Sequence, residues 1–261
     1  MLRRPEVILL LLVLGFGGFI AYQAVGKHAP TPRPVAAAPA AAASGEGGGG
    51  AGGGNEVVVG ASLPAPVRDV AAERQLLHDR AGGTYIDEIL AARDSNVARW
   101  PDRRANPVTV WIDEASPLAT PERGMPSQVR RAFSDWGAAG VPLAFNFIAD
   151  SAKADVKVTF VDRFNERISG RTVWRRDPNS WIVGGDIQLS LRDRDLRLLT
   201  QEQFYAISLH EVGHLLGLDH TADTTAIMAA RVRVLTLAPQ DVATMRLIYE
   251  VQPGSVKAAA R

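Results

Sequence analysis

The stretch HEVGHLLGLDH at residues 210–220 holds three of the chain's five histidines, and a glutamate directly follows the first of them. In an α-helix each residue turns the chain by about 100° around the axis, so His210 and His214 would lie about 40° apart. Glu211 would project from the same side of the helix. The spacing therefore predicts a helix that presents two imidazoles and one carboxylate together.

The two ends of this helix carry their own sequence signals. Thr200 can cap the first turn, and Gln203 stands three residues later, as in a capping box. Gly217 accepts the left-handed conformation in which helices commonly end, so the chain can turn there. That turn would bring His220 back toward the first two histidines, and three imidazoles would then converge.

The chemistry of this cluster indicates a metal ion. Because the chain has no cysteine, thiolate ligands are excluded, and three neutral imidazole nitrogens suit one catalytic zinc ion with a remaining position for water. Zinc lowers the pKa of that water, and Glu211, beside a ligand but off its helix face, is placed to accept a proton from it. The predicted chemistry is metal-assisted hydrolysis of a carbonyl compound.

Two simpler explanations compete with a catalytic metal. Histidines that cluster by chance would leave the intervening Glu211 and the following Gly217 as coincidences. A closed structural zinc site would need a fourth ligand. His28 lies in a low-complexity segment and His78 in a separate helical region, so we expect neither of them to bind the metal.

The composition favours a folded domain without a nucleic-acid partner. The 261 residues are 46% hydrophobic, which is enough to bury a sizeable core in one or two domains. A formal net charge of +1 provides no broad basic field of the kind that nucleic acids usually require. We therefore expect a protein that does not bind nucleic acid. We also expect it to be a monomer.

The N-terminal sequence predicts export. Arg3 and Arg4 precede an apolar stretch at residues 7–25, and residues 1–26 are expected to form either an uncleaved signal anchor or a cleaved signal peptide. The positive-inside rule then places the rest of the chain outside the cytoplasm, either tethered to the membrane or secreted. Residues 27–55 are Pro/Ala-rich and then Gly-rich, which predicts a flexible linker.

Residues 56–98, called the lead below, contain two predicted amphipathic helices. The sequence leaves three roles open for the lead: a pro-segment, a helical brace on the next domain, or a spacer. The apolar positions are Val67, Val70 and Leu77 for the first helix, and Ile86, Ile89, Leu90 and Val97 for the second.

From about Trp100 onward, short strands alternate with helices. The patterns predict an α/β fold, with α+β nearly as apt, built on a sheet of four to five strands. A helix is expected to begin near Pro126, bury Val129, Phe133 and Trp136, and end at Gly137 or Gly140. The predicted strands lie at residues 108–112, 145–148, 156–161 and 186–191.

The histidine stretch resembles the H-E-x-x-H-x-x-G-x-x-H signature of metzincin zinc endopeptidases. Met228 follows His220 by eight residues, which is the spacing that the matrixin branch of that family uses before its Met-turn. Residues 237–250 are similar to the matrixin C-terminal helix, and residues 154–160 and 183–190 are similar to its third strand and its antiparallel edge strand. The resemblance covers roughly residues 100–249.

The resemblance implies a domain at residues 99–252, followed by a disordered tail at 253–261. In that domain a twisted mixed sheet with an antiparallel edge strand would carry an active-site helix and a C-terminal helix. One zinc would be bound by His210, His214 and His220, with Glu211 as general base and Met228 beneath the metal. The edge strand would bind an extended substrate through Gly185, Asp186, Ile187, Gln188, Leu189 and Ser190.

Several family features are missing from the sequence. Without cysteine there is no thiolate to keep a precursor latent, and the loop histidines that hold a second zinc in many members are absent. Ala230, Arg231 and Val232 replace the Pro-x-Tyr that usually follows the Met-turn, so subsite preference stays open. A calcium site also stays open, because four residues lie where the family often binds calcium: Asp155, Gly184, Gly185 and Asp186.

Together these features predict an exported zinc metalloendopeptidase, which hydrolyses peptide bonds through a zinc-bound water activated by Glu211. Its partners would be a protein or peptide substrate and, through residues 1–26, the membrane. The alternative is an exported binding or scaffold module that keeps a metzincin fold without significant proteolysis. Loss of Glu211 or of one of the three histidines would be the expected mark of that alternative, and the sequence keeps all four.

Overall fold

The computed structural model describes residues 55–60, 63–118, 124–193 and 195–257. The predicted signal segment at residues 1–26 and almost all of the linker at 27–55 lie outside these ranges. Among the helices that are described, none is both long and apolar enough to cross a membrane. Export and membrane attachment therefore stay predictions from the sequence.

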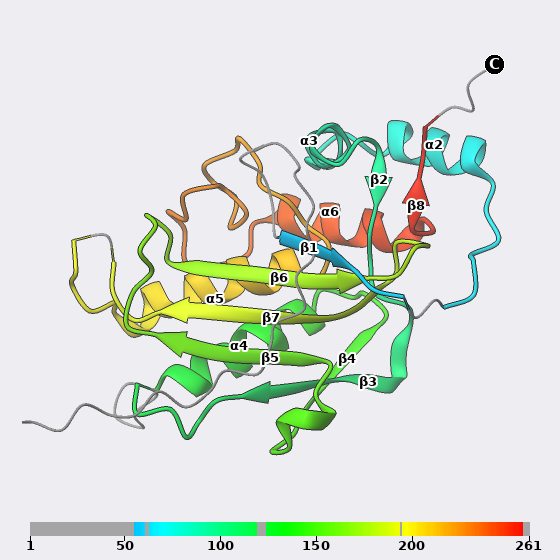
Figure 1. Cartoon of the computed structure of the whole chain (residues 1–261). Coiled ribbons are helices and arrows are strands. Elements are labelled where there is room, and N and C mark those ends of the chain that lie inside the picture. Colours follow the sequence, from blue (N-terminus) through cyan, green and yellow to red (C-terminus); the bar gives the residue numbers. More distant parts are fainter. Residues whose placement is uncertain (1–54, 61–62, 119–123, 194, 258–261) are drawn as a thin grey trace, which may run out of the picture. The chain divides into compact units, whose positions relative to one another are not determined.

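In the described part of the chain, six strands form one mixed sheet, which confirms the predicted fold class with one to two strands more than expected (Figure 1). All neighbouring strands run parallel except β6, which is antiparallel to β7. The order across the sheet is β1 (Asn55–Val58), β6 (Gly170–Arg176), β7 (Ile182–Ser190), β5 (Val156–Val161), β3 (Arg103–Ile112) and β4 (Leu143–Phe147).

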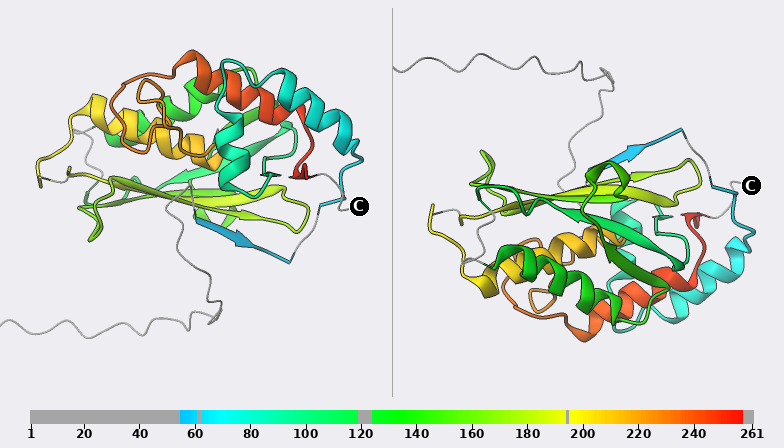
Figure 2. Two further views of the ribbon diagram at one scale, coloured as in Figure 1. Left: turned by 90° about the horizontal axis from the view of Figure 1, so that it is seen from above. Right: turned by 90° about the horizontal axis from the view of Figure 1, so that it is seen from below.

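The α-helices all pack on one face of this sheet (Figure 2). The helix predicted near Pro126 is α4, and its expected apolar face of Val129, Phe133 and Trp136 is fully buried. Trp136 also donates its indole N–H to the Leu209 carbonyl at 2.8 Å, which joins α4 to α5. The helices are α2 (Val70–Asp79), α3 (Ile86–Ala92), α4 (Met125–Gly137), α5 (Gln201–Leu215) and α6 (Pro239–Glu250).

The lead forms the two helices that its sequence predicts, but two of the predicted apolar residues lie outside them. Val97, assigned to the second helix, lies in β2 (Asn96–Val97) because α3 already ends at Ala92. Leu77 of α2 and both Ile86 and Ile89 of α3 are buried in the common core. Val67, predicted for the first apolar stripe, is 97% exposed because α2 begins only at Val70. The predicted disordered tail is also wrong in part, since β8 (Gly254–Ser255) pairs with β2 in the lead.

The assignment of residues 185–190 to an edge strand is wrong. These residues belong to β7, which pairs with β5 on one side and with β6 on the other, so both of its hydrogen-bonding edges are occupied. The misplaced residues are Gly185, Asp186, Ile187, Gln188, Leu189 and Ser190. The antiparallel strand is β6, whose sequence GRTVWRR buries only Thr172 and Trp174 and lacks the clear alternation that marks a strand.

Candidate metal centre

The helix α5 begins and ends where its sequence predicts. Thr200 and Gln203 form a reciprocal capping box at the first turn. The helix ends at Leu215, and Gly217 has a φ of +104°, a conformation that favours glycine. A side chain at Gly217 would also collide with the carbonyl oxygen of Ala98, so the turn requires glycine on two grounds. This turn directs His220 back toward α5.

The three histidines converge as the spacing predicts. The Nε2 atoms of His210 and His214 lie 3.1 Å apart, and each lies 3.2 Å from Nε2 of His220. Nitrogens that bind one tetrahedral zinc at about 2.0–2.1 Å lie roughly 3.3 Å from one another. The separation therefore fits a single zinc ion held by the three Nε2 atoms, and these histidines form the one metal-ligating cluster found among the described residues.

The far side of two of these rings fixes which nitrogen faces the centre. Nδ1 of His210 lies 2.8 Å from the Ile227 carbonyl oxygen, and Nδ1 of His214 lies 3.1 Å from the Leu218 carbonyl oxygen. Since a carbonyl accepts only, each Nδ1 carries the proton, and each Nε2 directs a lone pair inward. Converging lone pairs without a proton between them repel one another, and a cation removes that repulsion.

Burial keeps the rings in the form that binds metal. Desolvation lowers the pKa of His210 to about 4, and it lowers the pKa of His214 well below its usual value. The pKa of His220 is lowered too, for the same reason, although the charge of Asp219 works against this shift. Because metal ions bind neutral imidazole, the centre needs no loss of protons from the rings at neutral pH.

Glu211 lies beside the cluster in a closely fitted space. Its side chain is buried, and the hydroxyl of Thr172 donates to its Oε2 at 2.7 Å. Desolvation raises the pKa of Glu211 to about 7, while the hydrogen bond from Thr172 works in the opposite direction. Gly170 on the same strand leaves the space for the carboxylate, because a Cβ there would collide with it.

Met228 lies where the Met-turn spacing implies, beneath α5 and fully buried. A Cβ on Gly213 would collide with the Met228 sulfur, so the glycine between the two helix histidines permits this contact. The Met228 carbonyl accepts from the Thr221 N–H at 3.1 Å, which ties the turn to the residue after His220. The structure thus brings Met228 against the helix that carries two of the three histidines.

The histidines and Glu211 line a cleft of about 710 Å³. One wall comes from residues 167–172 at the start of β6, and the other from residues 230–235 after the Met-turn. None of residues 185–190, the predicted substrate-binding residues, lines the cleft. The sequence carries no signal for the roles of Gly170 and Thr172, because nothing local links them to a helix almost 40 residues later in the chain.

The four residues considered for calcium do not fit that ion. Arg175 of β6 faces Gly184 of β7, where its guanidinium contacts the Asp186 carboxylate and donates to the Asp155 carbonyl at 3.2 Å. A Cβ on Gly184 would lie 2.6 Å from the same guanidinium, and one on Gly185 would lie 2.5 Å from a methyl of Leu215. An arginine side chain thus occupies the space between the oxygens.

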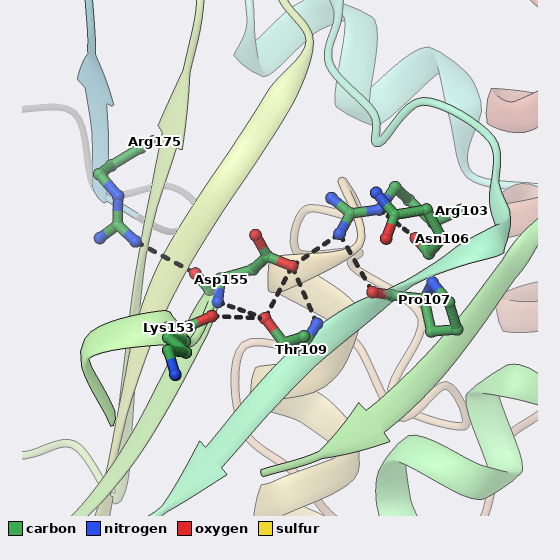
Figure 3. Close-up of polar contacts among 7 residues, drawn as sticks. All are labelled: Arg103, Asn106, Pro107, Thr109, Lys153, Asp155 and Arg175. Carbon is green, nitrogen blue, oxygen red and sulfur yellow. Dashed lines mark hydrogen bonds and ion pairs between the residues drawn. The ribbon is translucent and has the colours of Figure 1, made fainter. Parts of the chain in front are cut away.

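One carboxylate oxygen of Asp155 is also engaged within the protein (Figure 3). Its Oδ2 accepts from Arg103 at 2.7 Å, from the Thr109 N–H at 2.9 Å and from the Thr109 hydroxyl at 3.0 Å. Calcium takes six to eight oxygen ligands. Here the guanidinium groups of Arg175 and Arg103 contact these oxygens in place of a calcium ion.

The sequence is similar to one family of known proteins. The sequence model of the matrixin family matches residues 99–250. The chain is 27% identical over 148 residues to Metalloendoproteinase 1 of Glycine max, covering 49% of this chain and 46% of the relative. It is 27% identical over 144 residues to Metalloendoproteinase 1-MMP of Arabidopsis thaliana, covering 48% and 37%. The chain thus spans less than half the length of either relative.

We predict that His220→Ala removes most of the bound zinc. Two histidines alone bind zinc weakly, and the turn that carries His220 supplies the third nitrogen. Elemental analysis of the purified chain should find about one zinc per wild-type molecule and far less in the variant. His78→Ala, which changes an exposed histidine on α2, is the matched control and should keep its zinc. Two tightly held zinc ions in the wild type would contradict the ligand set.

A second prediction concerns calcium. In calcium-free buffer with zinc held constant, added calcium chloride should leave the melting temperature of the wild type unchanged, because Arg175 occupies the site. Arg175→Ala should lower the melting temperature and make it respond to calcium. Arg176→Ala is the control, since Arg176 pairs with Glu56 instead. A clear rise of the wild-type melting temperature with calcium would show that the ion displaces Arg175 or binds elsewhere.

Proposed function

The chain belongs to the matrixin family, and from that premise we propose that it is a zinc-dependent endopeptidase. The observation that carries the proposal is the convergence of three Nε2 atoms within 3.2 Å of one another, with the buried Glu211 beside them. Zinc, when bound by His210, His214 and His220, acts as a Lewis acid that polarises a carbonyl and acidifies water. The substrate is a peptide or protein.

Glu211 takes the role of general base. In its carboxylate form it accepts a proton from the attacking water, and the same group can then deliver that proton to the leaving amine. A general base works best when its pKa lies near the working pH. Burial raises the pKa of Glu211 to about 7, and Thr172 restrains the rise by donating a hydrogen bond to the carboxylate.

The outer edge of β6 is the best place for an extended substrate. β1 pairs with β6 only at Val173–Arg176, so residues 170–172 have no neighbouring strand on that side in the described part of the chain. These three residues also line the cleft. A peptide that adds to this edge as a further strand would lie beside Glu211. This assignment replaces residues 185–190, which lie inside the sheet.

The location of the enzyme belongs to the same proposal. We place the catalytic domain outside the cytoplasm because of the two arginines and the apolar stretch in residues 1–26. The alternative of a scaffold module without proteolysis is not favoured. A scaffold has no need of a buried carboxylate aimed at the site, and burial of Glu211 costs free energy in its charged form.

Replacement of Glu211 should separate chemistry from metal binding. Glu211→Gln keeps the size of the side chain but removes the base, so peptide cleavage should fall by at least about 100-fold. Zinc content should stay near that of the wild type, because the three histidines are unchanged. Cleavage of casein and elemental analysis on the same samples measure both effects. Full activity in the variant would remove Glu211 from the mechanism, whereas loss of zinc would make it a ligand.

Thr172 should set the acidic limit of activity. Its hydrogen bond stabilises the charged carboxylate and so lowers the pKa of Glu211. Thr172→Val removes this donor, which raises that pKa, and the acidic limb of the kcat/KM profile should move to higher pH. A zinc ion lowers the pKa of the carboxyl in both proteins, so the measured quantity is the difference between them. Thr172→Ser keeps a hydroxyl and should restore the wild-type limb; an unmoved limb in Thr172→Val would exclude this role.

A further inference from the structure

The lead is connected to each of the three histidines. It contacts the groups that bind the outer side of the rings or flank them in the chain. It ends at residue 98, so it precedes the segment at 99–250 that matches the family. The connections run through α3 and the residues at its two ends, Tyr85 and Arg93.

Arg93 holds the turn between His214 and His220. Its guanidinium donates to the Gly217 carbonyl at 2.9 Å and to the Leu218 carbonyl at 3.1 Å, and it pairs with Asp219 at 3.2 Å. The Leu218 carbonyl also accepts from His214, and the other carboxylate oxygen of Asp219 accepts from the His220 N–H at 2.7 Å. One partly buried side chain therefore supports the hydrogen-bond partners of two histidines.

Glu88 holds the chain on the other side of His220. Its Oε1 accepts from the Thr221 hydroxyl at 2.9 Å, and its Oε2 accepts from the Ala222 N–H at 2.7 Å. Arg93 thus binds the residue immediately before His220, and Glu88 binds the residue immediately after it. Both side chains come from α3 or its C-terminal end, so a single helix sets the position of this loop.

Tyr85 connects the lead with the first histidine. Its hydroxyl donates to Oδ1 of the buried Asp241 at 3.1 Å, and Oδ2 of Asp241 accepts from the Ile227 N–H at 2.9 Å. The Ile227 carbonyl in turn accepts from Nδ1 of His210. This path is longer than the one through Arg93. Like that path, it ends at a backbone carbonyl that accepts from the Nδ1 of a histidine.

We propose that residues 85–93 of the lead are a permanent positioning element of the zinc site. Arg93 and Glu88 are its positioning residues, since they touch the loop around His220 and not the reacting atoms. The inference rests on the proposed zinc site and decides among the three roles that the sequence leaves open for the lead. A spacer would not bury Ile86 and Ile89 in the core, and removal of a pro-segment that contained Arg93 would release the His220 loop.

The test is the zinc affinity of the full chain, measured by competition with a chromophoric chelator at constant pH. Groups that orient metal ligands typically contribute about 10- to 100-fold to metal affinity, so Arg93→Ala should raise the Kd for zinc by that factor. Arg93→Lys keeps the charge but not the planar fork, and should recover only part of the loss. Glu88→Gln should weaken zinc binding in the same direction and to a smaller extent.

Arg80→Ala provides the matched control in the lead. It removes an exposed ion pair with Glu250 on α6 and should leave the Kd for zinc unchanged. The melting temperature of each zinc-free variant is measured beside the Kd. If Arg93 only stabilised the fold, Arg93→Ala would melt earlier but bind zinc as the wild type does, and that result would overturn the proposal. If Arg93→Ala does not fold, Glu88→Gln decides in the same way.

Two further outcomes are distinct. A wild-type chain that binds no zinc at all would refute the proposed function itself. An active, zinc-loaded form whose N-terminal residue lies beyond Arg93 would refute only the permanent role of the lead. We expect N-terminal sequencing of the active form to find Tyr85 and all residues that follow it retained.

Discussion

The site depends on one electrostatic constraint, the approach of three imidazole nitrogens to within 3.2 Å of one another in a largely buried space. For His210 and His214 the Nδ1 proton is committed to a backbone carbonyl, so their inward lone pairs have no proton to share. Such an arrangement is stable only if the surrounding chain holds each ring in place or a cation lies between them. The structure supplies the first condition through groups far apart in the sequence.

Much of this site is predictable because it is local. Two ligands, the base and the turn that returns the third ligand all fall within eleven residues, and helix geometry alone relates the first three. The glycines add detail that the spacing does not explain. Gly217 allows a positive φ, whereas Gly213 and Gly170 make space for the Met228 sulfur and the Glu211 carboxylate. Their role depends on neighbours that only the folded chain brings close.

The parts that the sequence did not predict are all products of distant contacts. The strand β6 carries three arginines that form ion pairs, two of them with acidic residues on neighbouring strands. Its pattern therefore does not alternate cleanly between apolar and polar residues. Arg175 in that strand takes the place considered for calcium, and no motif signals such a substitution. Likewise Arg93 and Glu88 contact residues more than 120 positions later, a separation at which single-sequence patterns carry no information.

The charge of Arg93 argues for a geometric role. A cation near the metal centre opposes the binding of another cation, and Arg93 does lower the pKa of His214. Burial also lowers the pKa of Arg93 itself, and the nearby Asp219 carboxylate works against that shift. The ion pair is close to neutral as a unit, so it offers little attraction to zinc. Its contribution must then come from the fork of donors that fixes two carbonyls and one carboxylate, which a lysine cannot reproduce.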